Sequence, residues 1–539
     1  MTTSLAKRSS GPSVLVIGAG IGGLSVAIRL LAQGHDVTVL ERAPHPGGKM
    51  RQVFVGGLPF DAGPSVMTLP WVLDELCETA GVRRADLIRL TPLDPLCRHF
   101  FADGSQLDLF NDDPPDGRRP SDAAWERSAE EIRRVCGSRS AEQYRRFRWH
   151  AARIYQAVER PFMKSPIPRN PLGLVLQNRF RDALGLWRID AWRTLWKALG
   201  SFFSDERLRM LFARYATYSG ADPFVAPGTL AVIPHVEQGF GVYAVDGGMF
   251  RVAEALAELV HRLGGQIRYG ASVDRLLLDA AGRRVESVEV SGERLSADLI
   301  VANCDVQQLY ERMLDGTRCA DKLRKRYDAL EPSLSACLHL AVATDAQKLP
   351  LRHHNVFFTN DYRHEFAELQ SGPPSDPTVY LCNPDFAEDS QRWFFLTNSP
   401  ALPRRESPNE SATQALPWND ELIERCRQRV KAKLARHGID YSQHVRAEDA
   451  VTPQTFASLF PSSRGAIYGL AASSKMAAFV RPPNVLPGLS NLFCVGGGTH
   501  PGAGVPMVML SAQIVAGLIA KRFPSGQRVA ESLQTAGSR

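Results

Sequence analysis

The sequence predicts an α/β fold in which a parallel sheet is interrupted twice by a second, mixed domain. Residues 14–17 (VLVI) form an apolar run that leads through a glycine-rich turn into a helical pattern, and residues 492–495 (LFCV) do the same further along. Such runs are typical of strands buried on both faces of a parallel sheet. Between them, residues 112–240 have helical periodicity and are rich in Arg, Trp and Phe, which indicates a different unit.

Strand and helix patterns place the boundaries of the two domains. After the first strand, an apolar helical pattern ends at Gly34 and a second strand over residues 37–40 ends at Glu41, which is the size of a βαβ unit. The α/β pattern resumes near Gly248, with a helix and three short strands. We therefore assign residues 1–111, 241–305 and 483–525 to the α/β domain, 112–240 and 306–482 to the interrupting α+β domain, and 526–539 to a tail.

The composition is that of a folded globular enzyme. The chain has 539 residues, of which 44% are hydrophobic and 22% charged. Its net charge of +7 favours an anionic cofactor or membrane surface, while no basic repeat or aromatic ladder indicates nucleic acid. Nine scattered cysteines without a CxxC pair argue against a disulfide framework, so we expect a cytoplasmic protein. The most apolar stretch, residues 504–520, is shorter than the ~20 residues of a spanning helix, and we predict a buried core helix.

The turn after the first strand carries the pattern GxGxxG at Gly18, Gly20 and Gly23. Between a strand and a helix, the first glycine permits the tight turn and the second lets a pyrophosphate approach the backbone beside Ala19. The third glycine lets the helix pack closely, and the helix N-terminus holds the phosphate. Glu41 lies 21 residues beyond Gly20, where a carboxylate accepts hydrogen bonds from ribose hydroxyls. These residues predict a Rossmann-type dinucleotide site.

A second glycine turn decides between NAD and FAD, which share this pattern. Gly48 and Lys49 follow Glu41 within a few residues and suggest backbone that runs along a longer cofactor. Lys49 would neutralise a phosphate or the negative charge that develops on flavin. Pro64 lies in another close-approach turn, residues 61–65 (DAGPS). An NAD site has no use for either feature, so the sequence favours FAD.

A third glycine-rich loop, residues 495–506 (VGGGTHPGAGVP), joins a strand to the long apolar helix. It brings Gly498, Gly504 and Val505 to the helix N-terminus, whose positive end would stabilise negative charge on the flavin pyrimidine. The alternative interpretation of this loop is a flexible connector. His500 within it is expected to be a structural residue, and no catalytic residue is assigned.

Metal and hydrolase chemistry find no support in the sequence. His235 with Glu237, and His353 with His354, have spacings that fit no established metal site, so no metal is predicted. The motifs HExxH, GxSxG and GxxxxGK[ST] do not occur.

Together these blocks resemble the bacterial carotenoid desaturases, a phytoene-desaturase-type family of amine-oxidase-like FAD flavoproteins. The matching segments are residues 18–23 with Glu41, 46–49 (PGGK), 61–64 (DAGP) and 498–506 (GTHPGAGVP), and the THPGAGVP block is rather specific to this family. The resemblance covers nearly the whole chain. We assign the FAD site to Gly18, Ala19, Gly20, Gly23, Glu41, Gly48, Lys49, Pro64, Val273, Gly498, Gly504 and Val505.

Several segments resemble the hydroxycarotenoid 3,4-desaturase branch, also called methoxyneurosporene dehydrogenase, more closely than phytoene desaturase. These are residues 215–220, 233–238 (IPHVEQ), 352–358 (RHHNVFF) and 505–511 (VPMVMLS). Met507 stands where a phytoene desaturase is expected to have glycine, and Gly497 replaces the usual alanine. An unusual insertion occupies residues 114–124.

The resemblance implies an acyclic carotenoid substrate and 3,4-desaturation of 1-hydroxycarotenoids, with phytoene desaturation as the alternative. Desaturation removes a hydride to flavin and a proton from the adjacent carbon, and a dry apolar channel orients the substrate. The electron acceptor stays open, with quinone and oxygen as the options. Other classes also remain open: an amine or porphyrinogen oxidase, a non-catalytic escort protein on the same fold, and an NAD-dependent dehydrogenase.

A basic and aromatic stretch, residues 162–203, predicts peripheral association with the inner face of the membrane. This stretch contains seven lysines and arginines but only two aspartates. Aromatic residues alternate with the basic ones: Phe180, Trp187, Trp192, Trp196 and Phe202. Cations beside indole rings on helices are typical of interfacial anchors. The alternative is an ordinary helix pair with a solvated basic face and tryptophans in the core.

Overall fold

A five-stranded parallel sheet forms the base of the molecule in a computed structural model that describes residues 11–111, 122–167, 189–403, 418–471 and 481–523. The strand order is β10-β2-β1-β14-β20, and every neighbouring pair is parallel. The sequence therefore predicted the sheet type correctly. The strands are β1 (Ser13–Ile17), β2 (Asp36–Glu41), β10 (Gln266–Tyr269), β14 (Leu299–Ala302) and β20 (Leu492–Cys494).

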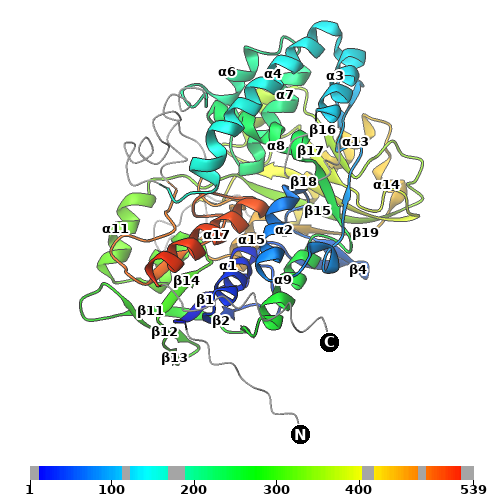
Figure 1. Ribbon diagram of the computed structural model, residues 1–539. Coiled ribbons are helices and arrows are strands. Elements are labelled where there is room, and N and C mark those ends of the chain that lie inside the picture. The colour runs from blue at the N-terminus through cyan, green and yellow to red at the C-terminus, as the bar shows by residue number, and fades with distance from the viewer. Residues whose placement is uncertain (1–10, 112–121, 168–188, 404–417, 472–480, 524–539) are drawn as a thin grey trace, which may run out of the picture.

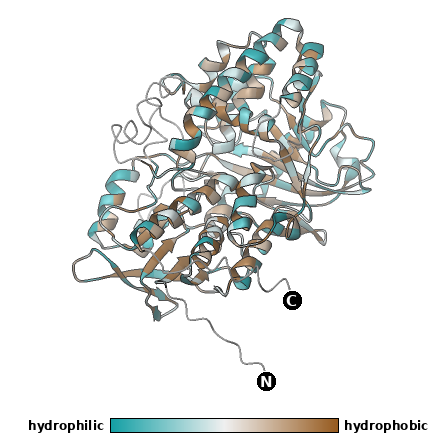
Figure 2. Ribbon diagram, viewed as in Figure 1, coloured by the Kyte–Doolittle hydropathy of each residue, from teal (hydrophilic) through white to brown (hydrophobic). Residues whose placement is uncertain are grey.

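Both faces of this sheet are buried, which explains the uninterrupted apolar runs. Val14 and Val16 of β1 pack into one core with α1 (Ile21–Ala32), α2 (Pro70–Thr79), α9 (Phe250–Arg262) and α17 (Val505–Arg522). Leu15 and Ile17 point to the opposite core, against a second sheet and the helices that follow β14. Figure 1 shows α1 and α17 side by side over the sheet, and Figure 2 shows the hydrophobic colouring of the strands. The elements of the opposite layer are β11 (Val273–Leu278), β12 (Val285–Val290), β13 (Glu293–Leu295), α10 (Val306–Gln308), η6 (Leu309–Met313) and α11 (Arg318–Tyr327).

The C-terminal helix α17 belongs to the core, in agreement with the sequence-based expectation. Within the described part of the chain it is the one helix long and apolar enough to cross a membrane. More than half of its apolar window is buried inside the protein, and its buried residues include Met509, Leu510 and Val515. Because these side chains pack against α1 and α2, burial within the protein accounts for its composition.

The second domain contains a seven-stranded mixed sheet of order β19-β15-β18-β17-β16-β7-β8. Its strands are β7 (Cys97–Phe100), β8 (Gln106–Leu109), β15 (Ser335–Thr344), β16 (His354–Phe357), β17 (Val379–Cys382), β18 (Ser390–Ser399) and β19 (Val445–Val451). One short helix precedes these strands in the sequence, and four more lie between or after them. They are η1 (Arg84–Asp86), α12 (Tyr362–Glu368), α13 (Asp420–Ala435), α14 (Tyr441–His444) and α15 (Pro453–Leu459). Two small sheets connect the domains: β3 (Gln52–Val55) with β4 (Leu58–Asp61), and β5 (Met67–Thr68) with β9 (Val242–Val245) and β6 (Leu90–Pro92).

A helical layer, drawn at the top of Figure 1, fills the expected segment 112–240. Its aromatic core includes Trp125, Tyr144, Phe147 and Phe212, which explains the richness of this segment in Trp and Phe. The helices are α3 (Ala123–Cys136), α4 (Ser138–Val158), η2 (Glu159–Met163), α6 (Leu195–Gly200), α7 (Glu206–Ala213), η4 (Arg214–Ser219), η5 (Gly228–Ala231) and α8 (Val232–Phe240).

The sheet assignments differ from the expected domain boundaries in two places. Strands β7 and β8 fall within residues 1–111 but pair in the seven-stranded sheet. Residues 306–327 fall within the expected interrupting domain, yet η6 and α11 pack on the parallel sheet. Short strands and amphipathic helices indicate a buried face without indicating which sheet they join, so the sequence pattern could not make either assignment.

We predict that Asn491→Ala lowers the melting temperature because this side chain joins two layers. Asn491 is fully buried; its Oδ1 accepts from the Val285 amide at 2.9 Å, and its Nδ2 donates to the carbonyls of Val285 and Asp298. Leaving buried backbone groups unpaired costs about 1–3 kcal/mol each. Ser490→Ala removes an exposed hydroxyl next to it and should leave thermal unfolding unchanged. Equal melting temperatures for the two variants would contradict this role.

Candidate active site

The predicted phosphate turn has the backbone geometry that its glycines suggest. Gly18 has a φ of +97°, and a Cβ there would lie 3.0 Å from the carbonyl oxygen of Asn303. A Cβ at Gly23 would lie 1.9 Å from the carbonyl oxygen of Gly18, so only glycine fits where α1 passes the turn. The pattern therefore reflects close packing between turn, helix and the end of β14.

Glu41 anchors this turn to the end of β2. Its Oε2 accepts from the Ala19 amide at 2.7 Å, and its Oε1 accepts from the Ala43 amide at 2.8 Å. The side chain is 7% exposed and borders a large cavity. A carboxylate has about four lone-pair positions, so Glu41 keeps acceptor capacity toward the cavity, as a ribose-binding residue requires.

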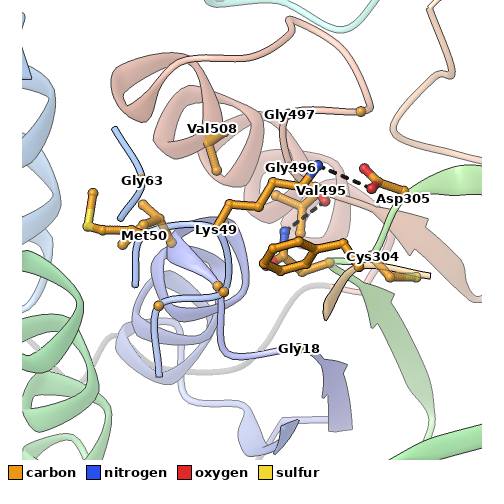
Figure 3. A pocket seen from close by; sticks show the side chains of 18 of the residues that line it. Gly18, Lys49, Met50, Gly63, Cys304, Asp305, Val495, Gly496, Gly497 and Val508 are labelled. Atoms are coloured by element: carbon orange, nitrogen blue, oxygen red, sulfur yellow. Dashed lines mark hydrogen bonds and ion pairs between the residues drawn. The ribbon is translucent and has the colours of Figure 1, made fainter. Parts of the chain in front are cut away.

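The cavity gathers the three glycine loops that the sequence singled out, as the close-up in Figure 3 shows. Ala19 and Gly23 lie behind its wall and shape the turn, whereas the other predicted residues line it directly. Those lining residues are Gly18, Gly20, Glu41, Gly48, Lys49, Pro64, Val273, Gly498, Gly504 and Val505.

Lys49 reaches the cavity but has its own partners. Its Nζ lies 3.2 Å from Oδ2 of Asp305 and 3.2 Å from the carbonyl oxygen of Ile467, and Figure 3 shows the ion pair. Both side chains are partly exposed to the cavity, with 31% of Lys49 and 15% of Asp305 accessible. The pair fixes the direction of the lysine and offsets much of its charge, so Lys49 acts as an oriented donor more than as a free cation.

Asn303 belongs to none of the sequence motifs, yet it contacts the glycine loops around the cavity. It follows β14 directly, and its Nδ2 donates to the carbonyl of Val495 at 3.0 Å, which ties β14 to the loop after β20. Its Oδ1 would lie 2.7 Å from a Cβ at Gly20. Ligands of open α/β sheets bind outside the carboxyl ends of the strands, so its position at the end of a predicted strand was the available signal.

The wall that faces the glycine loops is apolar and comes from the second domain. It is made by Leu338 of β15, Leu396 of β18, Phe456 of α15, and by Phe460 and Tyr468. No short motif marks these residues, since they belong to ordinary strands, a short helix and a loop. The cavity therefore has a polar backbone side suited to a dinucleotide and an apolar side suited to a hydrocarbon.

The histidine of the third loop is buried beside a backbone carbonyl. His500 is 1% exposed and its Nε2 lies 2.8 Å from the carbonyl oxygen of Ser165. Burial lowers the pKa of His500 to about 4, so the ring is neutral at physiological pH. The carboxylate of Glu237 accepts hydrogen bonds from the hydroxyls of Tyr215 and Tyr218.

The other histidine pair has a third neighbour that its spacing did not reveal. His353, His354 and Cys382 place one ligand atom each within 4.8 Å of one another. Burial lowers the pKa of His353 to about 4 and raises the pKa of the Cys382 thiol to about 12. The three groups are therefore neutral as they stand.

The fold and cavity define a dinucleotide-binding oxidoreductase, with a Rossmann-type sheet and a second domain that closes over its carboxyl edge. The sequence pattern of the flavin containing amine oxidoreductase family matches residues 21–520, and the chain belongs to this family. A triple mutant of putrescine oxidase has the same fold: the structures superpose with a TM-score of 0.59 over 95% of this chain and 99% of that one, at 15% identity.

Several curated relatives match nearly the full length, and two of them illustrate the range of identity. A hydroxyneurosporene desaturase from Cereibacter sphaeroides is 38% identical over 97% of this chain and 100% of its own length. A 1-hydroxycarotenoid 3,4-desaturase from a Flavobacterium species is 29% identical over 94% of this chain and 98% of its own length. These matches confirm the family resemblance and the fold class predicted from the sequence.

We predict that Gly20→Val abolishes flavin binding. A side chain there would point into the crevice between the first two loops and meet Oδ1 of Asn303. The purified variant should lose flavin absorbance by roughly tenfold or more, which corresponds to about 1.4 kcal/mol. Gly517→Ala is the matched control because a Cβ on that outer face of α17 meets nothing within 4 Å. Normal flavin content in a folded Gly20→Val protein, judged by circular dichroism, would place the cofactor elsewhere.

Proposed function

We propose that this protein is an FAD-dependent desaturase that introduces C=C bonds into an acyclic carotenoid, and that its reaction is 3,4-desaturation of a 1-hydroxycarotenoid. The observation that carries the proposal is the two-sided cavity, in which a dinucleotide-binding backbone faces an apolar wall. The names of the two relatives described above support the substrate class.

The lining residues fit FAD in particular. The cavity extends from Glu41 and Val273, where a ribose and its base would lie, past Gly20 to Gly504 at the start of α17. Gly48 approaches so closely that a Cβ on it would lie 3.2 Å from Cα of Gly20, which leaves a narrow cradle between two backbones. A cofactor that consisted of the adenosine half alone would not reach the third glycine-rich loop, residues 495–506.

When bound, FAD supplies the hydride acceptor for the reaction. The chain's own contribution is to hold the substrate and keep water away. Leu338, Leu396 and Phe456 offer the polyene an apolar surface, and α17 directs its positive N-terminal end into the cavity through Gly504 and Val505. Burial raises the pKa of the Cys304 thiol in the wall to about 12, so this group stays protonated.

Pigment analysis tests the substrate. The protein is produced in cells that make either phytoene or 1-hydroxylated acyclic carotenoids, and the pigments are separated by chromatography. We expect extended conjugation near the hydroxylated end and poor conversion of phytoene. Efficient conversion of phytoene to lycopene would favour the phytoene desaturase alternative. A protein that carries flavin yet converts neither would favour the escort-protein alternative, and trials with quinone or oxygen would identify the electron acceptor.

We also propose that the helical layer docks on the inner face of the membrane, where carotenoids dissolve. Among the described residues of this layer, three large apolar side chains are exposed: Trp149 on α4 at 65%, Trp192 at 48% and Val225 at 45%. Their segments are neighbours, because His150 lies 3.2 Å from Asp190 and residues 194 and 227 form a β-bridge. Exposed indoles beside cations are typical of interfacial anchors.

The rest of the predicted basic stretch divides between surface and core. Trp196 is 9% exposed and packs against the guanidinium of Arg209, so it belongs to the interior, while Lys197 is exposed. Phe180, Trp187 and most of the cations lie outside the described residues, as does most of the insertion at 114–124.

We expect the double variant Trp149→Ala, Trp192→Ala to bind anionic liposomes at least about tenfold more weakly, since each large apolar side chain leaving water contributes about 2 kcal/mol. Flavin content should be unchanged. Phe54→Ala removes an equally exposed aromatic side chain from β3, at 68% exposure, and should leave liposome binding unaltered. The docking surface lies elsewhere if sedimentation with liposomes is the same for all three proteins.

A further inference from the structure

One row of side chains leads from the cavity wall across the seven-stranded sheet. Leu338 pairs with Leu396, Leu396 with Tyr380, and Tyr380 with Val356. Residues directly opposite each other in neighbouring strands point to the same face of the sheet. The two leucines line the cavity, so Tyr380 on β17 is the next side chain on the same surface, one strand further from the cavity wall.

Tyr380 carries the first polar group on this row, and neighbours hold it firmly. Its hydroxyl lies 2.8 Å from Oγ of Ser65 and 2.8 Å from Nδ1 of His354. Ser65 follows Pro64, which also lines the cavity. A tyrosine hydroxyl offers one donor and two acceptor positions; Ser65 and His354 occupy two of them, and the third faces the Cys382 thiol, which hydrogen-bonds only weakly. Tyr380 itself is only partly buried, whereas its row neighbour Val356 is fully buried.

The hydroxyl and its partner are neutral, which defines the ligand they suit. Burial raises the pKa of Tyr380 well above its ordinary value, and burial, together with the positive charge of Arg214, lowers the pKa of His354 well below its own. Nε2 of His354 is buried without a hydrogen-bond partner among the described residues. Such polar groups cost free energy on an apolar surface unless a partner pairs with them. A neutral alcohol is a stronger partner than the Cys382 thiol for the third position of the Tyr380 hydroxyl.

We propose that Tyr380 is a specificity-determining residue that binds the hydroxyl group of the substrate, with Ser65 and His354 as positioning residues. This inference rests on the proposed function, a 1-hydroxycarotenoid desaturated at the 3,4 bond. With C–C bonds of about 1.5 Å, an oxygen three or four bonds from the reacting carbons lies roughly 4–5 Å from them. Neighbouring strands are about 4.8 Å apart. A reacting bond above Leu396 on β18 therefore places the hydroxyl above Tyr380 on β17.

The experiment compares two substrates that share one carbon skeleton, a 1-hydroxylated acyclic carotenoid and the same hydrocarbon without the hydroxyl. The flavin-loaded enzyme is assayed for kcat/KM on each, and equilibrium binding of each is measured separately by the shift in carotenoid absorbance. Tyr380→Phe removes only the hydroxyl. We expect it to reduce the preference for the alcohol about threefold to tenfold in both measurements, the effect of one neutral hydrogen bond. Flavin content should stay normal, and Ser65→Ala should reduce the preference less.

Two further tyrosines sharpen the test. Tyr441→Phe removes a buried hydroxyl that donates to Glu448 in a separate core, and its substrate preference should equal that of the wild type. Tyr468 lines the cavity itself, and loss of preference in Tyr468→Phe with retention in Tyr380→Phe would overturn the assignment. A wild type that desaturates neither compound would refute the proposed function, while the binding preference would still test Tyr380. An active wild type whose preference survives Tyr380→Phe would refute the hydroxyl site alone.

Discussion

The close approach of three backbone segments around Asn303 is the constraint on which the site depends. Its amide atoms lie where a Cβ on Gly20, Gly22 or Gly496 would come within 2.7 Å of them. The same amide donates to Val495. One side chain thus holds the first turn, the end of β14 and the last loop at a spacing that only glycines permit. The cavity exists at this edge because the three segments meet there without intervening side chains.

The nucleotide half of the site was predictable from the sequence, because its residues form motifs of neighbouring or closely spaced positions. Glu41 and the glycines of the first turn occur at a spacing that the backbone itself imposes, and each lies where the pattern predicts. Four of the five parallel strands were predicted as well, because burial on both faces leaves uninterrupted apolar runs. The edge strand β10 was not predicted, since its residues 266–269 (QIRY) are largely exposed and form no such run.

The substrate half was not predictable in the same way. Leu338 and Leu396 are ordinary strand residues that acquire their role only through sheet pairing, and nothing local distinguishes them from other leucines. The pairing of β7 with β16 was hidden for the same reason, since a short apolar strand does not indicate its partner. Asp305 was missed because its ion pair with Lys49 joins residues that are distant in sequence. Long-range pairing is a property of the whole chain, and no single window of sequence carries it.

The parallel sheet has a further consequence for how the protein is made. Its central strand, β1, is synthesised first, but its neighbour β14 and the edge strand β20 follow only after most of the chain has been translated. Domains generally fold as units during synthesis, and pairing between distant segments is slow. The nascent chain can place α1, α2 and α9 against β1 early, but the core over these strands stays incomplete until β20 and α17 leave the ribosome. The cavity, which the loop after β20 and the start of α17 help to line, is therefore completed only when nearly the whole chain has been made.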